Sequence, residues 1–182
     1  VLPRAVLEHR GWPAVLDHWN GFRIRTKQRF GGALKKEEAF YIPLRHTEGK
    51  NLKIELLLKE FKPVLENESI KKIGQNLKFD LEILKNEGVE LKGIGFDTMI
   101  ASYLLNPSGR QNSLSNLALE YLDYKMMPIS DLIGSGKKQI SFAQVPINSA
   151  SRYSCEDADF TLRLKELLEP RRFPTRTSFR PE

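Results

Sequence analysis

An aspartate lies on a helix face that should be buried. Between about Pro146 and Glu169 the sequence predicts a long helix that Pro170 ends. Residues spaced three or four apart form a stripe along one face of this helix: Ala150, Tyr153, Asp157, Thr161, Leu164, Leu168. A carboxylate on that stripe is costly unless it is paired, protonated or bound to a cation. Because Tyr153 lies one turn before Asp157, the phenol and the carboxylate can meet one small ligand.

A second helix, from Asn76 to about Glu87, repeats this arrangement. Asn76 and Asp80 are four residues apart, and apolar residues flank Asp80 at helical spacing. The helix follows a short strand predicted over 70–74, and α/β sheets commonly bind ligands where strands end. Two aspartates with an amide and a phenol nearby suit divalent ions. Hard oxygen ligands favour Mg²⁺ or Mn²⁺.

Both pairs also have a plainer structural interpretation. Asn76 could cap its helix and leave Asp80 exposed. Tyr153 and Asp157 could form a hydrogen-bonded pair within the core. Spacing alone leaves these alternatives open.

Other polar residues are assigned structural roles. Glu156 and Asp159 are expected to be solvated, and Asp97 to cap the helix that it opens. Lys137 and Lys138 belong to a predicted basic hairpin, where solvation is favoured over contact with phosphates.

The predicted elements give an α/β order. The sequence predicts strands over 39–44 and 70–74, and helices over 52–65 (interrupted or ended near Pro63), 76–87, 97–105, 113–122 and 146–169. Residues 125–144 are predicted to be a loop, and the segment before residue 33 shows no regular period. Strands alternating with helices indicate an α/β class.

Composition restricts the class of protein further. The chain has 182 residues, of which 40% are hydrophobic and 29% charged, as in globular domains. It contains no apolar run of about 20 residues and no secretory h-region in the sequence given. The single cysteine, Cys155, cannot form an internal disulfide, which favours a reducing cytoplasm. The chain begins with Val1, so we expect a fragment.

Charge divides the chain into three parts. The formal net charge is +6, yet residues 37–170 hold seventeen Lys/Arg against twenty Asp/Glu. Residues 1–30 and 171–182 together carry nine Arg and one Lys, whereas residues 31–170 carry four Arg and fifteen Lys. We therefore predict an unassigned Arg-rich segment over 1–32, a domain over 33–170 and an Arg-rich tail over 171–182.

Several motifs occur together in one order and spacing. They are Gly74-Gln-Asn76-Leu-Lys-Phe-Asp80, Phe96-Asp-Thr-Met-Ile-Ala-Ser-Tyr-Leu-Leu-Asn-Pro107, Ser113-Leu-Ser-Asn-Leu-Ala-Leu-Glu-Tyr-Leu122 and Tyr153-Ser-Cys-Glu-Asp157-Ala-Asp159. Over residues 33–170 the sequence resembles the 3′–5′ proofreading exonuclease domain of bacterial DNA polymerase I, a family A polymerase. The resemblance implies a ribonuclease H-like fold, with a mixed sheet flanked by helices. It also implies a four-acid exonuclease with Tyr in its third motif.

The resemblance implies roles for four residues. Asp80 would help to hold the second metal ion, and Asn76 would contact the substrate strand. Asp157 would ligate the first ion, and Tyr153 would orient the attacking water. The implied reaction is hydrolysis with two Mg²⁺ or Mn²⁺ ions at a frayed or single-stranded 3′ end of DNA. A polymerase domain in the parent protein is the implied partner.

The family's first motif, Asp-x-Glu on the first strand, is absent. The stretch Trp19–Phe30 contains no acid, so two of the four metal carboxylates are missing. Two aspartates do not readily hold two ions about 3.5–4 Å apart, which predicts impaired hydrolysis. The alternatives are an inactive pseudo-exonuclease that serves as a structural or DNA-binding module, and a ribonuclease D-like RNA exonuclease.

Both Arg-rich flanks coincide with the ends of the resemblance. One hypothesis is that both flanks are translated from the wrong reading frame, whereas the middle of the chain is authentic. The alternative is that the gene is the relic of a duplication and has acquired new ends. Either way, we expect the first strand to be missing or disrupted, which would leave an exposed sheet edge.

Overall fold

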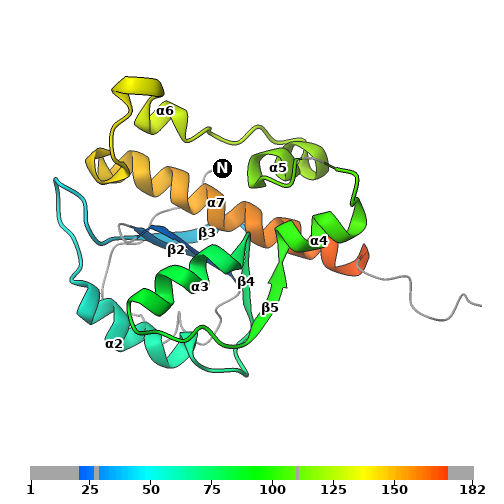
Figure 1. Ribbon diagram of the computed structural model, residues 1–182, viewed down its shortest axis with the longest axis horizontal. Helices are drawn as coiled ribbons and strands as arrows, with labels where there is room; N and C mark the ends of the chain where they lie inside the picture. Colours follow the sequence, from blue (N-terminus) through cyan, green and yellow to red (C-terminus); the bar gives the residue numbers. More distant parts are fainter. Residues whose placement is uncertain (1–20, 27–28, 110, 172–182) are drawn as a thin grey trace, which may run out of the picture.

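The computed structural model describes residues 21–26, 29–109 and 111–171 (Figure 1). The predictions for residues 1–20 and 172–182, which include most of the Arg-rich flanks, lie outside these residues. Within the described part of the chain, no helix combines the length and the apolar composition needed to cross a bilayer.

The sheet combines antiparallel and parallel pairs, so it is mixed, as expected. Strands β1 (Gly21–Thr26), β2 (Arg29–Lys35) and β3 (Glu38–Pro43) form an antiparallel ribbon. Strands β4 (Lys72–Gly74) and β5 (Ile94–Asp97) form a parallel pair. Of the expectation that the first strand is missing or disrupted, the missing strand is wrong, because β1 pairs with β2 and lies in contact with β4. Its pairing is nevertheless irregular between Arg23 and Thr26.

Both faces of the sheet are covered, and β3 shows why. Ala39 and Tyr41 belong to one buried apolar cluster, whereas Phe40 and Ile42 belong to another. Successive side chains of a strand point to opposite faces, so an apolar run fits a strand that is buried on both sides. The second cluster is filled from helices α2 (Ile54–Leu65) and α3 (Leu77–Asn86), below the sheet in Figure 1.

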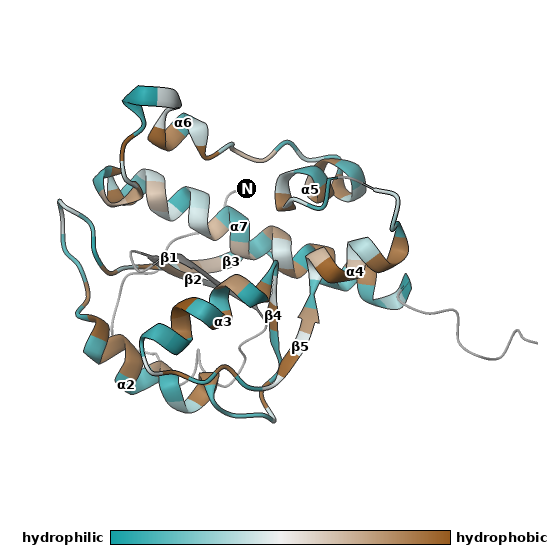
Figure 2. Cartoon of the chain, in the orientation of Figure 1, coloured by the Kyte–Doolittle hydropathy of each residue, from teal (hydrophilic) through white to brown (hydrophobic). Residues whose placement is uncertain are grey.

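The opposite face is covered by a long helix. Helix α7 (Ile147–Leu168) lies across β2 and β3 and contacts α4 (Thr98–Leu105) and α5 (Leu114–Leu122). Gly31 lies against this helix, because an added Cβ there would be in van der Waals contact, 3.6 Å, with the Ser154 carbonyl oxygen. Figure 2 shows polar residues in the middle of α7, although this part of the helix is buried.

Helix α2 ends at Leu65, the predicted bound, and Pro63 lies inside it without interrupting it. The predicted loop over 125–144 contains a short helix, α6 (Ser130–Ile133), and two 3-10 turns, Gly136–Lys138 and Phe142–Gln144. A third such turn, Glu169–Arg171, follows α7. Strands β1, β2 and β5 were not predicted.

Candidate functional site

The junction between β4 and α3 places Asp80 inside the protein. Asp80 is 1% exposed, which rules out the plainer interpretation of a solvated side chain. Asn76 is the residue before the helix and has the left-handed conformation φ 61°, ψ 53°. Its side chain makes no cap hydrogen bond. Asn76 therefore occupies the cap position without capping the helix through its own amide.

Asp97 supplies the cap instead, for two helices at once. Its carboxylate accepts hydrogen bonds from the backbone N–H groups of Met99 (2.9 Å) and Ile100 (3.3 Å), which confirms the predicted cap of α4. It also accepts from the N–H groups of Asn76 (3.1 Å) and Leu77 (2.7 Å) at the start of α3. No pattern in the sequence indicates this second role, because the two segments are about twenty residues apart.

A buried polar network fixes the residues just before Asn76. The Thr98 hydroxyl lies within hydrogen-bonding distance of the Gly74 carbonyl oxygen (3.2 Å) and of the Gln75 amide oxygen. The Gln75 amide nitrogen donates to the Asn112 carbonyl oxygen (2.7 Å), and the Ser102 hydroxyl donates to the Asn112 side chain (3.0 Å). Gln75 and Thr98 are both buried. The turn that presents Asn76 is thus held by α4 and by the segment before α5.

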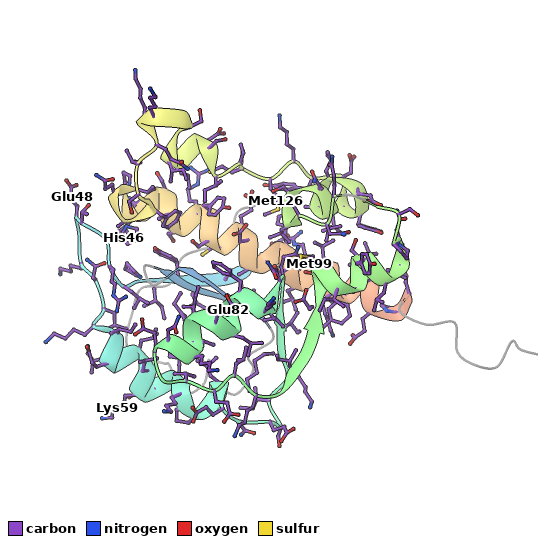
Figure 3. All side chains as sticks on the ribbon, in the orientation of Figure 1. His46, Glu48, Lys59, Glu82, Met99 and Met126 are labelled. Carbon is purple, nitrogen blue, oxygen red and sulfur yellow. The ribbon has the colours of Figure 1, made fainter. Side chains whose placement is uncertain are left out.

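Helix α7 carries the other candidate pair. Tyr153 and Asp157 are 5% and 6% exposed, so the predicted stripe does face the interior. The Tyr153 ring is in an aromatic cluster, with its centroid 6.2 Å from that of Phe142. Phe142 in turn lies 6.1 Å from the ring of His46, which follows β3 (Figure 3). This cluster fixes the side of α7 from which Tyr153 projects.

His46 has a structural environment rather than that of a metal ligand. It is buried, its Nδ1 lies 3.0 Å from the Val145 carbonyl oxygen, and its Nε2 contacts the Tyr41 hydroxyl. Both ring nitrogens are therefore occupied. These contacts connect the end of β3 to the segment that leads into α7.

The expectation that Glu156 is solvated is wrong. Glu156 is buried, and its carboxylate accepts hydrogen bonds from the Tyr124 hydroxyl (2.9 Å) and the Met127 N–H (3.0 Å). The Tyr124 ring also stacks on Phe160, with centroids 4.2 Å apart. Glu156 therefore holds the segment after α5 against α7.

The same expectation is wrong for Asp159. Asp159 is 1% exposed and accepts hydrogen bonds from the Glu37 N–H (2.8 Å) and from Arg163 (2.7 and 2.8 Å). Glu37 has a positive φ in the turn between β2 and β3. Asp159 therefore anchors that turn to α7. The Asp159–Arg163 spacing of four residues was a sequence signal for this pair.

Asp157 differs from both of these acids. Among the residues that the structure describes, its carboxylate has no hydrogen bond or ion pair, so the hydrogen-bonded Tyr153–Asp157 core pair does not occur. A buried carboxylate without a protein partner is unfavourable, and a bound cation or ligand is a common compensation. Asp157 is thus the acid of α7 whose surroundings suggest a ligand.

The described residues do not complete a metal site. Across residues 21–26, 29–109 and 111–171, no three His, Cys, Asp or Glu side chains come together as they would around a metal ion. Asp80 and Asp157 come from different helices and supply two carboxylates. This donor set does not fit a two-ion centre of the kind that the sequence resemblance implies.

The fold and these residues define a class, and comparison with known proteins identifies the family. The family model described as "3'-5' exonuclease" matches residues 20–171. DNA polymerase I of Pseudomonas aeruginosa is 38% identical over 141 residues, covering 75% of this chain and 15% of the relative. This chain belongs to the 3′–5′ exonuclease family and resembles the exonuclease domain of bacterial DNA polymerase I.

Solved structures confirm the expected ribonuclease H-like fold. The M. smegmatis Pol1 structure in complex with DNA primer-template and dNTP has a TM-score of 0.64 at 17% identity, covering 92% of this chain and 27% of that one. Trypanosoma brucei RNase D in complex with RNA U12 has a TM-score of 0.69 at 15% identity, covering 91% and 61%. Brucella melitensis NrnC with bound Mg²⁺ has a TM-score of 0.58 at 20% identity, covering 86% and 76%.

The chain spans about 15% of the length of the DNA polymerase I relative from P. aeruginosa. The match therefore concerns one domain of a much longer protein. The activity, substrates and partners of such a whole protein are proposals for this chain.

Proposed function

We propose that this chain is a proofreading exonuclease domain that binds frayed or single-stranded 3′ ends of DNA but hydrolyses them poorly. The observation that carries the proposal is the contrast at the candidate site. Asp157 is buried without a described partner, yet the described residues contain no third acid to complete a metal centre. In this proposal one half of the site, formed by Asn76, Asp80, Tyr153 and Asp157, is retained. The ligands of the first motif, which would form the other half, are absent from the sequence.

The residues of this half have separate proposed roles. Asp80 and Asp157 are the carboxylates that would face metal, and Asn76 and Tyr153 are the groups that would contact the DNA strand. Mg²⁺ or Mn²⁺ is the proposed ion, and a polymerase domain of the same parent protein is the proposed partner. The buried, lone Cys155 supports a reducing, cytoplasmic location.

DNA is favoured over RNA as the substrate. This chain is 38% identical to a DNA polymerase I over the matched residues. Its similarity to T. brucei RNase D, at 15% sequence identity, is a similarity of fold alone. A pseudo-exonuclease that only binds DNA is the second candidate, and the absent first motif favours it.

The test measures binding and hydrolysis separately on the full chain. A 3′-labelled single-stranded oligodeoxynucleotide is incubated with Mn²⁺ or Mg²⁺, with EDTA as the metal-free arm, and binding is followed by fluorescence anisotropy. We expect binding, and a hydrolysis rate at least about a hundredfold below that of an intact homologous domain, since losing metal ligands removes several kcal/mol of transition-state stabilisation. No detectable hydrolysis with intact binding selects the pseudo-exonuclease.

Matched variants locate the site. Asp157→Ala and Asp80→Ala should remove any residual metal-dependent activity, whereas Glu82→Ala, at an exposed position of the same helix as Asp80, should not. Activity that survives Asp157→Ala would reject the site assignment. Hydrolysis as fast as in the homologous domain would reject the impairment, and faster cleavage of RNA than of DNA would favour the ribonuclease D-like alternative.

A further inference from the structure

Asp97 lies where two helices begin, and its contacts extend beyond a helix cap. One carboxylate receives four backbone N–H groups, two from the start of α3 and two from the start of α4. Both helix N-termini therefore direct their partial positive charge at the same anion. A carboxylate suits this place, because two oxygens can accept from two directions.

The division of these bonds between the two oxygens is informative. Oδ1 accepts from Asn76, Met99 and Ile100, whereas Oδ2 accepts from Leu77 at 2.7 Å, the shortest of the four contacts. The bond to Leu77, the shorter of the two at the start of α3, thus depends on the second oxygen, which α4 does not use. An asparagine could still cap α4 with its one oxygen, but its NH₂ group would face the Leu77 N–H.

Asn76 needs such an external hold. The left-handed region at φ 61° is unfavourable for residues other than glycine, although least so for asparagine, and contacts from the surroundings help to fix it. Its own side chain makes no cap bond, so the conformation is fixed through its N–H and that of Leu77. Holding the backbone in this way leaves the Asn76 amide available for another contact. Asp80 follows one turn later on the same helix.

We infer that Asp97 is a positioning residue for the candidate site: through its Oδ2–Leu77 contact it fixes the turn that presents Asn76 and aligns the first turn of α3, which carries Asp80. The inference rests on the proposed function only in taking Asn76 as a contact of the DNA strand. The geometric part, the control of Asn76 and Leu77 by Asp97, stands without any ligand.

The first test needs no DNA. Amide hydrogen exchange is measured by NMR on the full chain for wild type, Asp97→Asn and Thr98→Val. Asp97→Asn should speed exchange at Leu77 by about tenfold or more and leave Met99 within about threefold of wild type. Thr98→Val removes the neighbouring hydroxyl contacts with Gly74 and Gln75 but no bond to the Leu77 N–H, so exchange at Leu77 should change much less than in Asp97→Asn. Unchanged exchange at Leu77 in Asp97→Asn would overturn the inference.

The second test asks whether Asp97 acts through Asn76. Affinity for a short oligothymidylate is measured for Asp97→Asn, Asn76→Ala and the double variant. We expect Asp97→Asn to weaken binding by about fivefold, and to cause no further loss once Asn76 is alanine. A full additional loss in the double variant would mean that the two residues act independently, which overturns the inference.

Two further arms keep the test decisive. Asp97→Ser replaces Asp97→Asn if the latter fails to fold, because serine still caps α4 through one oxygen and cannot reach both helices. If the wild-type chain binds no oligonucleotide, the proposed function fails, while the exchange rates still decide whether Asp97 controls Leu77.

Discussion

Helix α7 and strand β1 contact each other, yet their sequences differ sharply in acidic residues. Helix α7 places three acids, Glu156, Asp157 and Asp159, in buried positions. Strand β1 has the sequence Gly-Phe-Arg-Ile-Arg-Thr, without an acid. The strand still pairs with β2, because pairing depends on backbone hydrogen bonds more than on particular side chains. Fold and chemistry are thus separable in this protein, as they are in protein families generally.

The largest effect is expected from giving β1 the acids that it lacks. We predict that an Asp-x-Glu pair on the correct face of β1 raises metal-dependent hydrolysis by at least about a hundredfold, since it completes the ligand set. Two double variants are compared, Arg23→Asp with Arg25→Glu, and Phe22→Asp with Ile24→Glu. Alternate residues of a strand face opposite sides, so only one pair can meet the α7 acids.

The measurement is release of labelled nucleotide from a 3′-labelled single strand in Mn²⁺, with EDTA as the blank. Each pair serves as the control of the other, because both add the same two side chains. Equal rates in both variants and in the wild type would show that the missing acids are not what limits the reaction.

Within α7, the second comparison is between Asp159 and Asp157. We predict that Asp159→Asn lowers the free energy of unfolding by about 2–4 kcal/mol, because it removes the charge of a buried acid that pairs with Arg163 and accepts from the Glu37 N–H. Asp157→Asn should leave stability unchanged or raise it by up to about 1 kcal/mol, since it removes an unpaired buried charge. Urea unfolding of the two variants at pH 7 checks this. Equal destabilisation would mean that Asp157 is a structural acid too.

Elements with strong apolar periodicity were predictable from the sequence. Helices α3, α5 and α7 begin and end within about two residues of the predicted bounds. Strand β2 was missed because Gly31 and Gly32 normally interrupt strands. Here the two glycines pair with Tyr41 and Phe40 of β3, and only the tertiary structure reveals this pairing. Strand β1 was missed although Phe22 and Ile24 alternate with two arginines, because the alternation is not sustained beyond this short segment.

The candidate site was predictable only in part. Helical spacing placed Asp157 on a face expected to be buried, whereas for Asp80 it left burial and exposure open; both are buried. The burial of Glu156 could not be predicted, because its partners Tyr124 and Met127 come from a segment about thirty residues away. Asp97 was predicted as a cap, but its second helix was not. Spacing along one helix therefore predicts which face a residue occupies, but it does not predict hydrogen-bond partners that are distant in sequence.

Lys72 is a buried basic residue and can be compared with the buried acids of α7. It lies on β4 and is fully buried, and its Nζ donates to the Asn67 carbonyl oxygen. Burial, with a smaller effect of neighbouring Lys71, lowers the pKa of Lys72 from 10.5 to about 8. Because the folded state then binds this proton less tightly than the unfolded state, stability should rise as the pH rises from about 8 to 10.5.

We therefore predict that Lys72→Met is more stable than wild type at pH 7, by an amount on the order of 1 kcal/mol. The difference should shrink between pH 8 and 10.5, where the wild-type lysine loses its charge. Urea unfolding of both proteins at several pH values measures this. A variant that is less stable at every pH would mean that the contact with Asn67 outweighs the cost of burying the charge.

The smallest effect is expected at Cys155, which precedes the acids of α7. Burial raises the pKa of its thiol to about 11, so little thiolate forms near neutral pH. Cys155→Ala should lower the free energy of unfolding by about 1 kcal/mol or less and leave DNA affinity unchanged, because the thiol fills space without contacting substrate. Iodoacetamide labelling at pH 8 should be slow in the native wild type and fast in urea. Rapid labelling of the native protein would show that this part of α7 opens, and that its acids are less firmly buried than their exposed fractions indicate.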